Sequence, residues 1–482
     1  DTLASAGAQA RPALVDVLTS GSGDAIHWLR DRAGVDLSLK ARLGGHSKPR
    51  THRPSNGMAG AEIVYAMQRE VKKFEKSGAV KILLDTKVTS LVASPTGEIT
   101  GVMTTTAAAA AATTNTTSTT QQTQQTQQTH LSPTTILATG GFASDRSPQS
   151  FLSSYRPDLL PFPATAGPFS TGDGISLASS AGATTVDMEH VQLHPTGWVD
   201  PKGPRSPTKT LAAELMRGVG GILVNDDGRR FCDELGTRKY VTEKMLQHDR
   251  EYAQSGTWSK TDSEPQVFGL ILTEKMAQEG RKHVDLYKHK GLVSMVQGIK
   301  DLAELVGVED EEALRQTLRD YQSLASASLE QIVDQKDDQK DHQKDHQKDH
   351  QKDDFGKDKF PNFPQDFDVD NGIYYAGKVT PVLHYCMGGV SISPSGEVLG
   401  EGGQVIKGLM AAGEVAGGVH GGNRLAGNSL AECAVFGRKV GQGVEIQKRE
   451  GRGGISASDS GSGFGLAPST DADASKIVVK GE

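Results

Sequence analysis

Apolar residues spaced three and four positions apart predict two helices near the start of the chain. The first pattern covers residues 11–32 and fits one or two amphipathic helices, and the second runs from 60 to 74. Short runs rich in β-branched residues follow and predict strands. The predicted strands cover residues 82–85, 88–92, 97–102 (after a turn) and 134–138.

Strands and helices continue to alternate in the rest of the chain. Asp173 suits the N-terminal end of a helix, and the Asp-Gly pair in residues 226–228 favours a tight hairpin turn. This order predicts an α/β fold with an insertion between the strand that ends at Gly141 and the next strand near Leu409. The elements concerned are a helix at 175–181, a hairpin of 222–225 and 229–233, a strand at 408–411 and a helix at 429–441.

Two low-complexity tracts interrupt the pattern. Residues 104–130 are a run of Thr, Ala and Gln, and residues 335–354 repeat Gln-Lys-Asp-His. Neither tract can bury enough apolar surface to offset the entropy of ordering, so we expect a disordered loop and a solvated repeat. On a helix His342, His346 and His350 would share one face and could hold a metal ion. A solvated repeat is the favoured interpretation, and we predict no metal site.

Composition narrows the class of protein. The 482 residues are too many for one ordinary core and predict two or three domains, and 56 glycines point to many tight turns. A formal charge of −7 makes nucleic acid an unexpected partner, and no apolar run is long enough to predict a membrane span. Three widely separated cysteines argue against iron–sulfur, zinc and disulfide frameworks and favour a reducing compartment.

Several cationic side chains stand beside Gly or Thr in short clusters. A dicarboxylate needs hydrogen-bond donors at both ends, and Arg and His supply them. Glu214 and Arg217 are three positions apart, so one helical turn would place them side by side. Taken singly, each cluster is better explained as a surface ion pair or a capped turn. The clusters are HPT at 194–196, ELMRG at 214–218, ELGTR at 234–238, HYCMGG at 384–389 and GVHGGNRL at 418–425.

Two elements near the C-terminus are suited to an anion or a hydroxyl-bearing ligand. Glu414 follows a strand and could accept a hydrogen bond from a ribose or ribityl hydroxyl. Ser429 opens a helix, whose N-terminus offers free N–H groups. An ordinary βα loop with a serine cap explains the same residues equally well.

Five strings, taken together and in order, are specific to one family. They are HPTG, AAELMRGVGGILVN, GRRFCDELGTR, HYCMGGV and AAGEVAGGVHGGNRLAGNSLAECAVFG. They resemble the soluble, fungal-type fumarate reductases, within the flavoprotein family shared with succinate dehydrogenase and L-aspartate oxidase. The resemblance runs from Asp1 to about Gly441, apart from the two tracts. It implies an FAD-dependent enzyme that reduces fumarate to succinate by hydride transfer from flavin N5, with protonation by an arginine. Another α,β-unsaturated carboxylate, such as methacrylate or urocanate, is the alternative substrate.

The resemblance also implies which residues bind the substrate. His194 would bind one carboxylate, and His384 with Arg424 would bind the other and twist it out of conjugation. Gly427 would lie against the substrate as well. Fixed cations would then stabilise negative charge where it develops during the reaction.

The remaining roles implied by the resemblance concern the proton and the cofactor. Arg238 would donate the proton, and Glu214 with Arg217 would supply it. A purely electrostatic role for Arg238 is the alternative. The residues implied to lie against FAD are Val88, Gly140, Asp173, Glu414, Arg424, Ser429 and Leu430.

Two features depart from the family pattern. Ala213 stands where bacterial relatives have a threonine that contacts the carboxylate. The family also opens with a strand and a GxGxxG turn, and this sequence contains no such turn. Gly21-Ser22-Gly23-Asp24 imitates it only in part and lies in a helical pattern. The sequence therefore predicts an N-terminally truncated chain that binds FAD weakly or not at all, and an inactive remnant is the alternative to an enzyme.

These features predict a two-domain arrangement. We expect an FAD-binding Rossmann-like domain in two segments, 1–187 and 380–448, an inserted α+β capping domain at 188–379 and a flexible tail at 449–482. The substrate would lie between the two domains. The expected partners are a small dicarboxylate and an electron donor that the sequence does not identify, in the cytoplasm or the mitochondrion.

Overall fold

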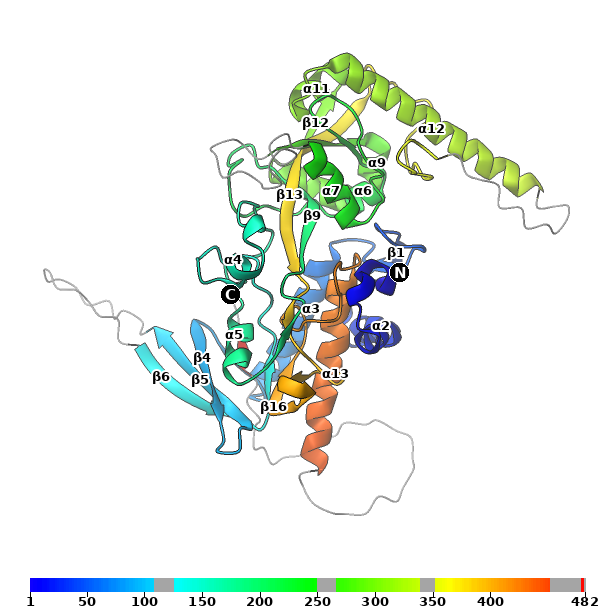
Figure 1. Ribbon diagram of the computed structural model, residues 1–482. Coiled ribbons are helices and arrows are strands. Elements are labelled where there is room, and N and C mark those ends of the chain that lie inside the picture. The colour runs from blue at the N-terminus through cyan, green and yellow to red at the C-terminus, as the bar shows by residue number, and fades with distance from the viewer. Residues whose placement is uncertain (108–124, 249–265, 339–351, 451–477, 481–482) are drawn as a thin grey trace, which may run out of the picture.

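The chain forms two lobes that share one long strand (Figure 1). The computed structural model describes residues 1–107, 125–248, 266–338, 352–450 and 478–480. Strand β13, Ile373–Cys386, runs from the upper lobe into the lower lobe, and β9, Val191–Trp198, pairs with it in antiparallel orientation. Each lobe has its own buried apolar cluster. The β9–β13 pair therefore crosses between two separately packed cores.

A single helix covers the first predicted helical pattern. This helix, α2, is Pro12–Ala33, and Pro12 occupies its first turn, where a missing N–H has no cost. Gly34 ends the helix in the left-handed conformation, with φ 68°. Gly21 and Gly23 lie inside α2, which confirms that this segment is not a nucleotide-binding turn.

A parallel strand pair lies at the centre of the lower lobe. β7, Thr135–Leu137, is parallel to β16, Val405–Ala411, and β15, Glu397–Leu399, pairs with the other edge of β16. Helix α13, Asn428–Glu450, packs against α2. These elements confirm the predicted strands and helix, although α13 continues past the predicted end at 441.

A three-stranded antiparallel sheet at the side of the lower lobe corrects the first tract prediction. It consists of β4, Thr86–Ala93, β5, Ile99–Ala107, and β6, Gln125–Leu131. Both ends of the Thr/Gln tract are therefore strands and not a disordered loop. Threonine favours the extended backbone, and the β5–β6 ladder satisfies the main-chain polar groups without a large apolar core. The middle of the tract lies outside the described residues.

The upper lobe is built on a mixed α and β core. Its sheet has the order β10–β11–β13–β12, with β9 added to β13. β10 is Ile222–Val224, β11 is Phe268–Thr273 and β12 is Ser294–Gln297. The helices of this lobe are α6 (Leu215–Gly218), α7 (Arg238–His248), α9 (Glu274–Glu279), α10 (Arg281–His289), α11 (Ile299–Val306) and α12 (Glu311–Asp338).

The predicted hairpin at 222–233 is wrong in its second arm. The turn is present, because Gly228 N–H donates to the carbonyl of Asn225, and Asn225 N–H donates to that of Arg229. Residues 229–233 form no strand, and β10 pairs with the fully buried β11 instead. The charged side chains after the turn are used in ion pairs, so the apolar β11 is the better partner for the core.

The second tract and the tail differ in part from expectation. Helix α12 continues into the Gln-Lys-Asp-His tract as far as Asp338, and the three tract histidines lie outside the described residues. Residues 451–477 also lie outside them. Strand β17, Val478–Lys480, pairs in parallel with β3, Lys81–Leu83, so this part of the tail is a strand.

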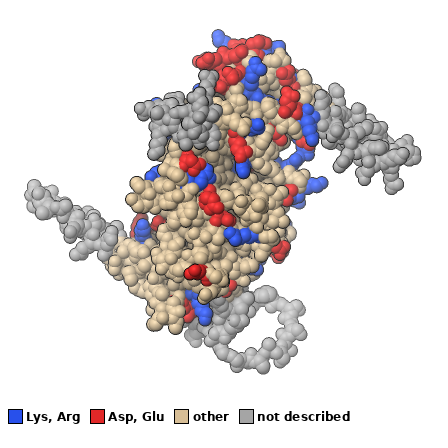
Figure 2. All heavy atoms as spheres, viewed as in Figure 1, with Lys and Arg blue, Asp and Glu red and all other residues tan. Residues whose placement is uncertain are grey.

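Figure 2 shows acidic side chains gathered at the top of the upper lobe, where α12 begins with Glu311 and Glu312. No helix among the described residues is long and apolar enough to cross a membrane, and no cluster of metal-ligating side chains occurs in the same part of the chain. The remaining elements are α1 (Thr2–Ala6), η1 (Gly7–Gln9), β1 (Leu39–Ala41), β2 (Thr51–Arg53), α3 (Ala59–Lys76), α4 (Phe151–Tyr155), η2 (Pro157–Leu159), α5 (Asp173–Ser180), β8 (Thr185–Val186), β14 (Gly389–Val390) and η3 (Glu401–Gly403).

Candidate active site

A buried histidine and a partly exposed one lie side by side where β9 and β13 cross between the lobes. His194 is in β9 and His384 is in β13, and the centroids of their rings are 5.1 Å apart. Both predicted carboxylate-binding histidines therefore stand in strands, not at the turns that the sequence pattern suggested. Burial lowers the pKa of both imidazoles well below the usual range, and the charge of Arg238 lowers them further.

Hydrogen bonds determine which ring nitrogen of His194 carries the proton. The N–H of Thr196 donates to Nδ1 of His194 at 3.1 Å, so Nδ1 is an acceptor and Nε2 carries the hydrogen. Nε2 has no hydrogen-bond partner. Nδ1 of His384 bonds to the hydroxyl of Thr165 at 2.8 Å. Neutral His194 is thus an N–H donor without a hydrogen bond, with Oε2 of Glu214 4.0 Å away, while Thr165 fixes the His384 ring.

The predicted proton relay is assembled around one buried carboxylate. Nε of Arg238 donates to Oε2 of Glu214 at 2.7 Å, and Nη2 of Arg217 lies 3.8 Å from the same oxygen. Glu214 immediately precedes α6, so the expected one-turn spacing to Arg217 is confirmed. Burial opposes ionisation of Glu214, but the two arginines outweigh it and lower the pKa of Glu214. Burial lowers the pKa of Arg217.

Gly44 closes the other side of Glu214 and was not predicted from the sequence. Its backbone N–H donates to Oε1 of Glu214 at 2.6 Å. A side chain at position 44 would come within 2.7 Å of that oxygen and 2.6 Å of the carbonyl oxygen of Gly236. Only glycine therefore allows the backbone to approach the carboxylate. The Gly44-Gly45 pair in the sequence was the available signal.

Gln192 joins the relay to the loop that carries Arg424. Its Oε1 accepts from Nη1 of Arg238 at 3.0 Å, and its Nε2 donates to the carbonyl of Arg424 at 2.8 Å and to Asn423 at 2.9 Å. Sequence reasoning missed this residue. A glutamine two positions before His194 in an apolar strand lies on the same strand face as the histidine, which could have identified it.

Arg424 is buried with few polar partners. Its guanidinium carbon lies 4.4 Å from the centroid of the Tyr385 ring, and its Nη1 donates only a long bond, 3.4 Å, to the carbonyl of Leu425. Nε has no partner. Burial, together with the charge of Arg238, lowers the pKa of Arg424 to about 10.

Positive charge exceeds negative charge in this cluster. Arg217, Arg238 and Arg424 are 1 %, 8 % and 3 % exposed, and Glu214 neutralises them only in part. Unsatisfied buried donors are costly unless an anion supplies acceptors. The cluster is therefore suited to a small anion with more than one carboxylate. The unpartnered donor atoms are His194 Nε2, Arg217 Nε and Nη2, and Arg424 Nε.

Two predicted cofactor residues lie at one edge of the parallel strand pair. Leu137 and Ala411 are register partners at the carboxyl ends of β7 and β16, so the following residues Gly140 and Glu414 come from adjacent strand ends. Ligands of α/β sheets commonly bind at this edge. The main chain of Cys386 donates to Oε1 of Glu414 at 2.8 Å, and burial raises the pKa of Glu414 to about 7.

The other predicted cofactor residues lie on three elements of the lower lobe. Val88 is in β4 and Asp173 begins α5, and Nζ of Lys87 lies 3.7 Å from Oδ2 of Asp173. Ser429 and Leu430 are in the first turn of α13. Gly427, predicted to bind substrate, precedes that helix with φ 82° and packs beside Thr51.

Comparisons with known proteins show the family to which the chain belongs. A family model described as an FAD binding domain matches residues 1–430. The fumarate reductase of Schizosaccharomyces pombe is 35 % identical over 448 residues, which cover 92 % of this chain and 76 % of that protein. Fumarate reductase 1 of Saccharomyces cerevisiae is 33 % identical over 459 residues, which cover 93 % of this chain and 85 % of that protein.

A solved structure of a fumarate reductase has a similar fold. The open conformation of a flavocytochrome c3 fumarate reductase matches with a TM-score of 0.61 and 28 % identity, over 91 % of this chain and 65 % of that chain. Fold and site thus define an FAD-dependent oxidoreductase. The chain belongs to the FAD-binding flavoprotein family that includes the fungal fumarate reductases. The predicted family, fold class and cofactor are confirmed.

The residues present fit an FAD molecule. A Cβ built on Gly140, which has φ 76°, would meet no heavy atom within 4 Å, so open space lies against the backbone at the carboxyl end of β7. The buried hydroxyl of Thr139 beside it has no partner. Glu414 offers an acceptor at the neighbouring strand end, and the positive end of the α13 dipole lies at Asn428.

Proposed function

We propose that this chain reduces fumarate to succinate with the help of bound FAD. The observation that carries the proposal is the buried, positively charged cluster in which Nε2 of His194 and Nε of Arg424 have no hydrogen-bond partner. A planar dicarboxylate has acceptor oxygens at both ends and would supply the partners that these donors lack.

The two carboxylates have different proposed partners. His194 binds one carboxylate through Nε2–H, and this ring stays neutral because burial and Arg238 lower its pKa. His384 and Arg424 bind the other, beside Gly427. Holding that carboxylate twisted allows negative charge to accumulate on it as the double bond is reduced, close to fixed cations.

Arg238 is the proposed proton donor. The reaction adds a hydride to one alkene carbon and a proton to the other, and FAD supplies the hydride when it is bound. Arg238 donates to Glu214 at 2.7 Å, so a proton lost from its guanidinium can be replaced through that carboxylate once the carboxylate has taken up a proton from the next member of the relay. Arg217, 3.8 Å from the same oxygen, is the next member of the relay.

Several residues are proposed to hold the cofactor. Gly140 and Glu414 would contact it at the carboxyl ends of β7 and β16. Ser429 and Leu430 would do so at the start of α13. Arg424, Val88 and Asp173 complete the proposed set. The first segment, up to 187, and the second, 380–448, would form the FAD-binding domain around the inserted cap at 188–379.

Because the sequence predicts weak FAD binding, the purified protein is first incubated with excess FAD, and turnover of several unsaturated acids then tests the proposal. With dithionite-reduced viologen as electron source, we expect fumarate to be reduced much faster than methacrylate or urocanate. If either monocarboxylate were reduced faster than fumarate, that compound would be assigned as the substrate instead. A protein that retains FAD and reduces none of them would refute the proposal. The compartment, cytoplasmic or mitochondrial, stays a prediction.

A further inference from the structure

A second buried charge cluster lies in the upper lobe, outside the proposed active site. Nζ of Lys357 donates to Oε2 of Glu234 at 2.6 Å, and Arg230 makes a two-pronged contact with both oxygens of Glu234 at 2.8 and 2.9 Å. Arg230 also donates to Asp353 at 2.9 Å. The side chains of Lys357 and Glu234 are 1 % and 0 % exposed, so water contributes almost nothing to their solvation.

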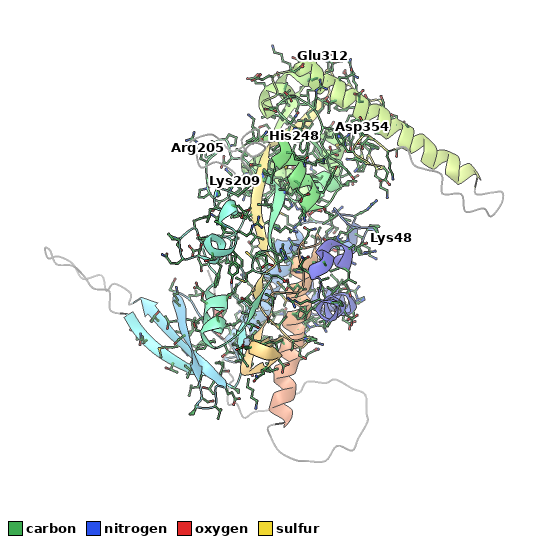
Figure 3. All side chains as sticks on the ribbon, in the orientation of Figure 1. Lys48, Arg205, Lys209, His248, Glu312 and Asp354 are labelled. Carbon is green, nitrogen blue, oxygen red and sulfur yellow. The ribbon has the colours of Figure 1, made fainter. Side chains whose placement is uncertain are left out.

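Aromatic rings complete the enclosure of this cluster. The charged groups of Arg230 and Lys357 lie 4.8 and 5.1 Å from the centroid of the Tyr321 ring. Asp353 accepts from the main-chain N–H groups of Phe355 and Lys357 at 2.9 and 2.8 Å, so it also shapes the turn that delivers Lys357. The cluster thus ties the segment 352–360 to the loop 230–238. Asp354, labelled in Figure 3, marks this segment beside α12.

The same loop carries two contacts of the proposed proton relay. The carbonyl oxygen of Glu234 accepts a hydrogen bond from Nη1 of Arg217. Four residues later Arg238 begins α7 and reaches Glu214. The side chain of Glu234 is therefore held by Lys357 while its main chain holds the relay. A displacement of this loop would move Arg238 relative to Glu214 and disturb the hydrogen bond that holds Arg217.

Core stability alone does not explain a buried ion pair at this place. Two charges removed from water cost several kcal/mol each, and apolar side chains of the same volume are often at least as stabilising. An ion pair with several directed hydrogen bonds fixes a backbone position more narrowly than apolar packing does. The backbone that the ion pair fixes here is the loop 230–238, which holds Arg217 and leads into Arg238.

We propose that Lys357 and Glu234 are positioning residues for proton delivery, acting through the loop 230–238 on Arg217 and Arg238. This inference deepens the proposed fumarate reduction and rests on it for its catalytic part. Only the main-chain carbonyl of Glu234 reaches the substrate cluster, through its hydrogen bond from Arg217. Their effect is expected on turnover, where the proton is delivered, and not on substrate affinity, which depends on His194 and Arg424.

Three variants of the FAD-loaded protein test the inference. Lys357→Met keeps the length of the side chain without its charge, Lys357→Arg keeps the charge, and Arg315→Met is the matched control. Arg315 lies in a partly exposed ion cluster of the same lobe with Glu311 and Asp370. We expect Lys357→Met to lower kcat at least tenfold with KM unchanged within twofold. Lys357→Arg should restore most of the loss, and Arg315→Met should resemble the unmodified protein.

Amide hydrogen exchange tests the positioning step without reference to activity. Lys357→Met should speed exchange more in peptides that cover 230–238 than in peptides that cover β10 and β11, whose faster exchange reports only the general loss of stability. If Lys357→Met does not fold, the double variant Glu234→Gln/Lys357→Met, which leaves no unpaired carboxylate, takes its place with the same expectations.

The outcomes separate this inference from the proposed function. Unchanged exchange in 230–238 overturns the positioning role. Faster exchange with unchanged kcat, or a loss expressed in KM alone, overturns the link to proton delivery. If the unmodified protein does not reduce fumarate, the proposed function fails while the exchange data still decide whether Lys357 holds the loop.

Discussion

The two buried charge clusters of this protein differ in how completely their charges are matched. In the upper lobe Arg230 and Lys357 face Glu234 and Asp353, and each of these four side chains has hydrogen-bond partners within the described chain. In the candidate active-site cluster Arg217 and Arg238 contact Glu214 and Arg424 adds a third buried positive charge, and four donor atoms of His194, Arg217 and Arg424 have no hydrogen-bond partner.

Burial disfavours the charged form in both clusters, but neighbouring charges outweigh it for Glu234 and not for Arg424. The pKa of Glu234 falls to about 2 because Lys357 and Arg230 outweigh its burial, so the folded protein favours the charged pair. The pKa of Arg424 falls to about 10 because burial, reinforced by Arg238, disfavours its charge. The charges of one cluster are matched within the described chain, and we propose that a bound anion completes the other. Each prediction below tests this distinction.

The largest effect is expected at Arg238. Replacement by Ala or Lys should lower turnover by about 10²–10⁴-fold with little change in KM, because the proton is needed in the transition state. Steady-state kinetics with fumarate measure both constants. Reduction of the bound flavin by an artificial donor is the control and should be unaffected. Near-normal turnover in Arg238→Ala would assign proton donation to Arg217 or His194 instead.

Loss of one partner from the complete cluster should mainly affect folding. Lys357→Met leaves Glu234 short of a counter-charge in a fully buried place and should lower the free energy of unfolding by about 3–5 kcal/mol. Urea unfolding measures this change. Asp370→Asn, which breaks the partly exposed pairs with Arg315 and Arg319, is the control and should have little effect. Equal losses in both variants would mean that burial does not distinguish the two clusters.

The fold was predictable where one segment determines its own structure. The spacing of apolar residues in 11–32 specified α2, and short apolar runs specified β7 and β16. The prediction of a strand at 229–233 was wrong because β10 pairs with the distant β11. The residues of a turn give no information about a strand elsewhere in the chain that pairs more favourably. The prediction of disorder for the Thr/Gln tract was wrong at both of its ends for a similar reason, since the β5–β6 ladder depends on strand pairing and not on apolar content.

The candidate site was predictable as a set of residue types but not as a network. Glu214 and Arg217 could be paired because helical spacing relates them. Gln192 and Gly44 were missed because their contacts with Arg238 and Glu214 join residues 46 and 170 positions apart. Lys357 was missed as well, since its partner Glu234 lies 123 positions earlier in the chain.

A smaller effect of opposite sign is expected when the incomplete cluster loses a charge. The folded-state pKa of Arg424, about 10, is below its value of 12.5 in a free side chain, so its charge costs folding free energy at neutral pH. Arg424→Met should therefore raise the free energy of unfolding without substrate by about 1 kcal/mol. Fumarate should no longer raise the melting temperature of this variant. A loss of several degrees without substrate would show that stacking on Tyr385 outweighs the buried charge.

The smallest effect is expected from pH. The folded protein raises the pKa of Glu414 to about 7 from 4.5, so the folded state keeps a proton that the unfolded chain has released. The free energy of unfolding should therefore fall as pH rises from 4.5 through 7. We expect a fall of about 1 kcal/mol, less than full burial would give because Glu414 is partly exposed.

Glutamine variants isolate the two carboxylates in this pH profile. Glu414→Gln should abolish the fall between pH 4.5 and 7, as measured by urea unfolding across that range. Glu234 contributes in the opposite sense: its pKa is lowered to about 2, so its stabilisation is present above pH 4.5 and is lost as pH falls toward 2. Glu234→Gln should therefore alter only the acidic side of the profile. If Glu414→Gln left the slope above pH 4.5 unchanged, the carboxyl group at the end of β16 would be as well solvated as one on the surface.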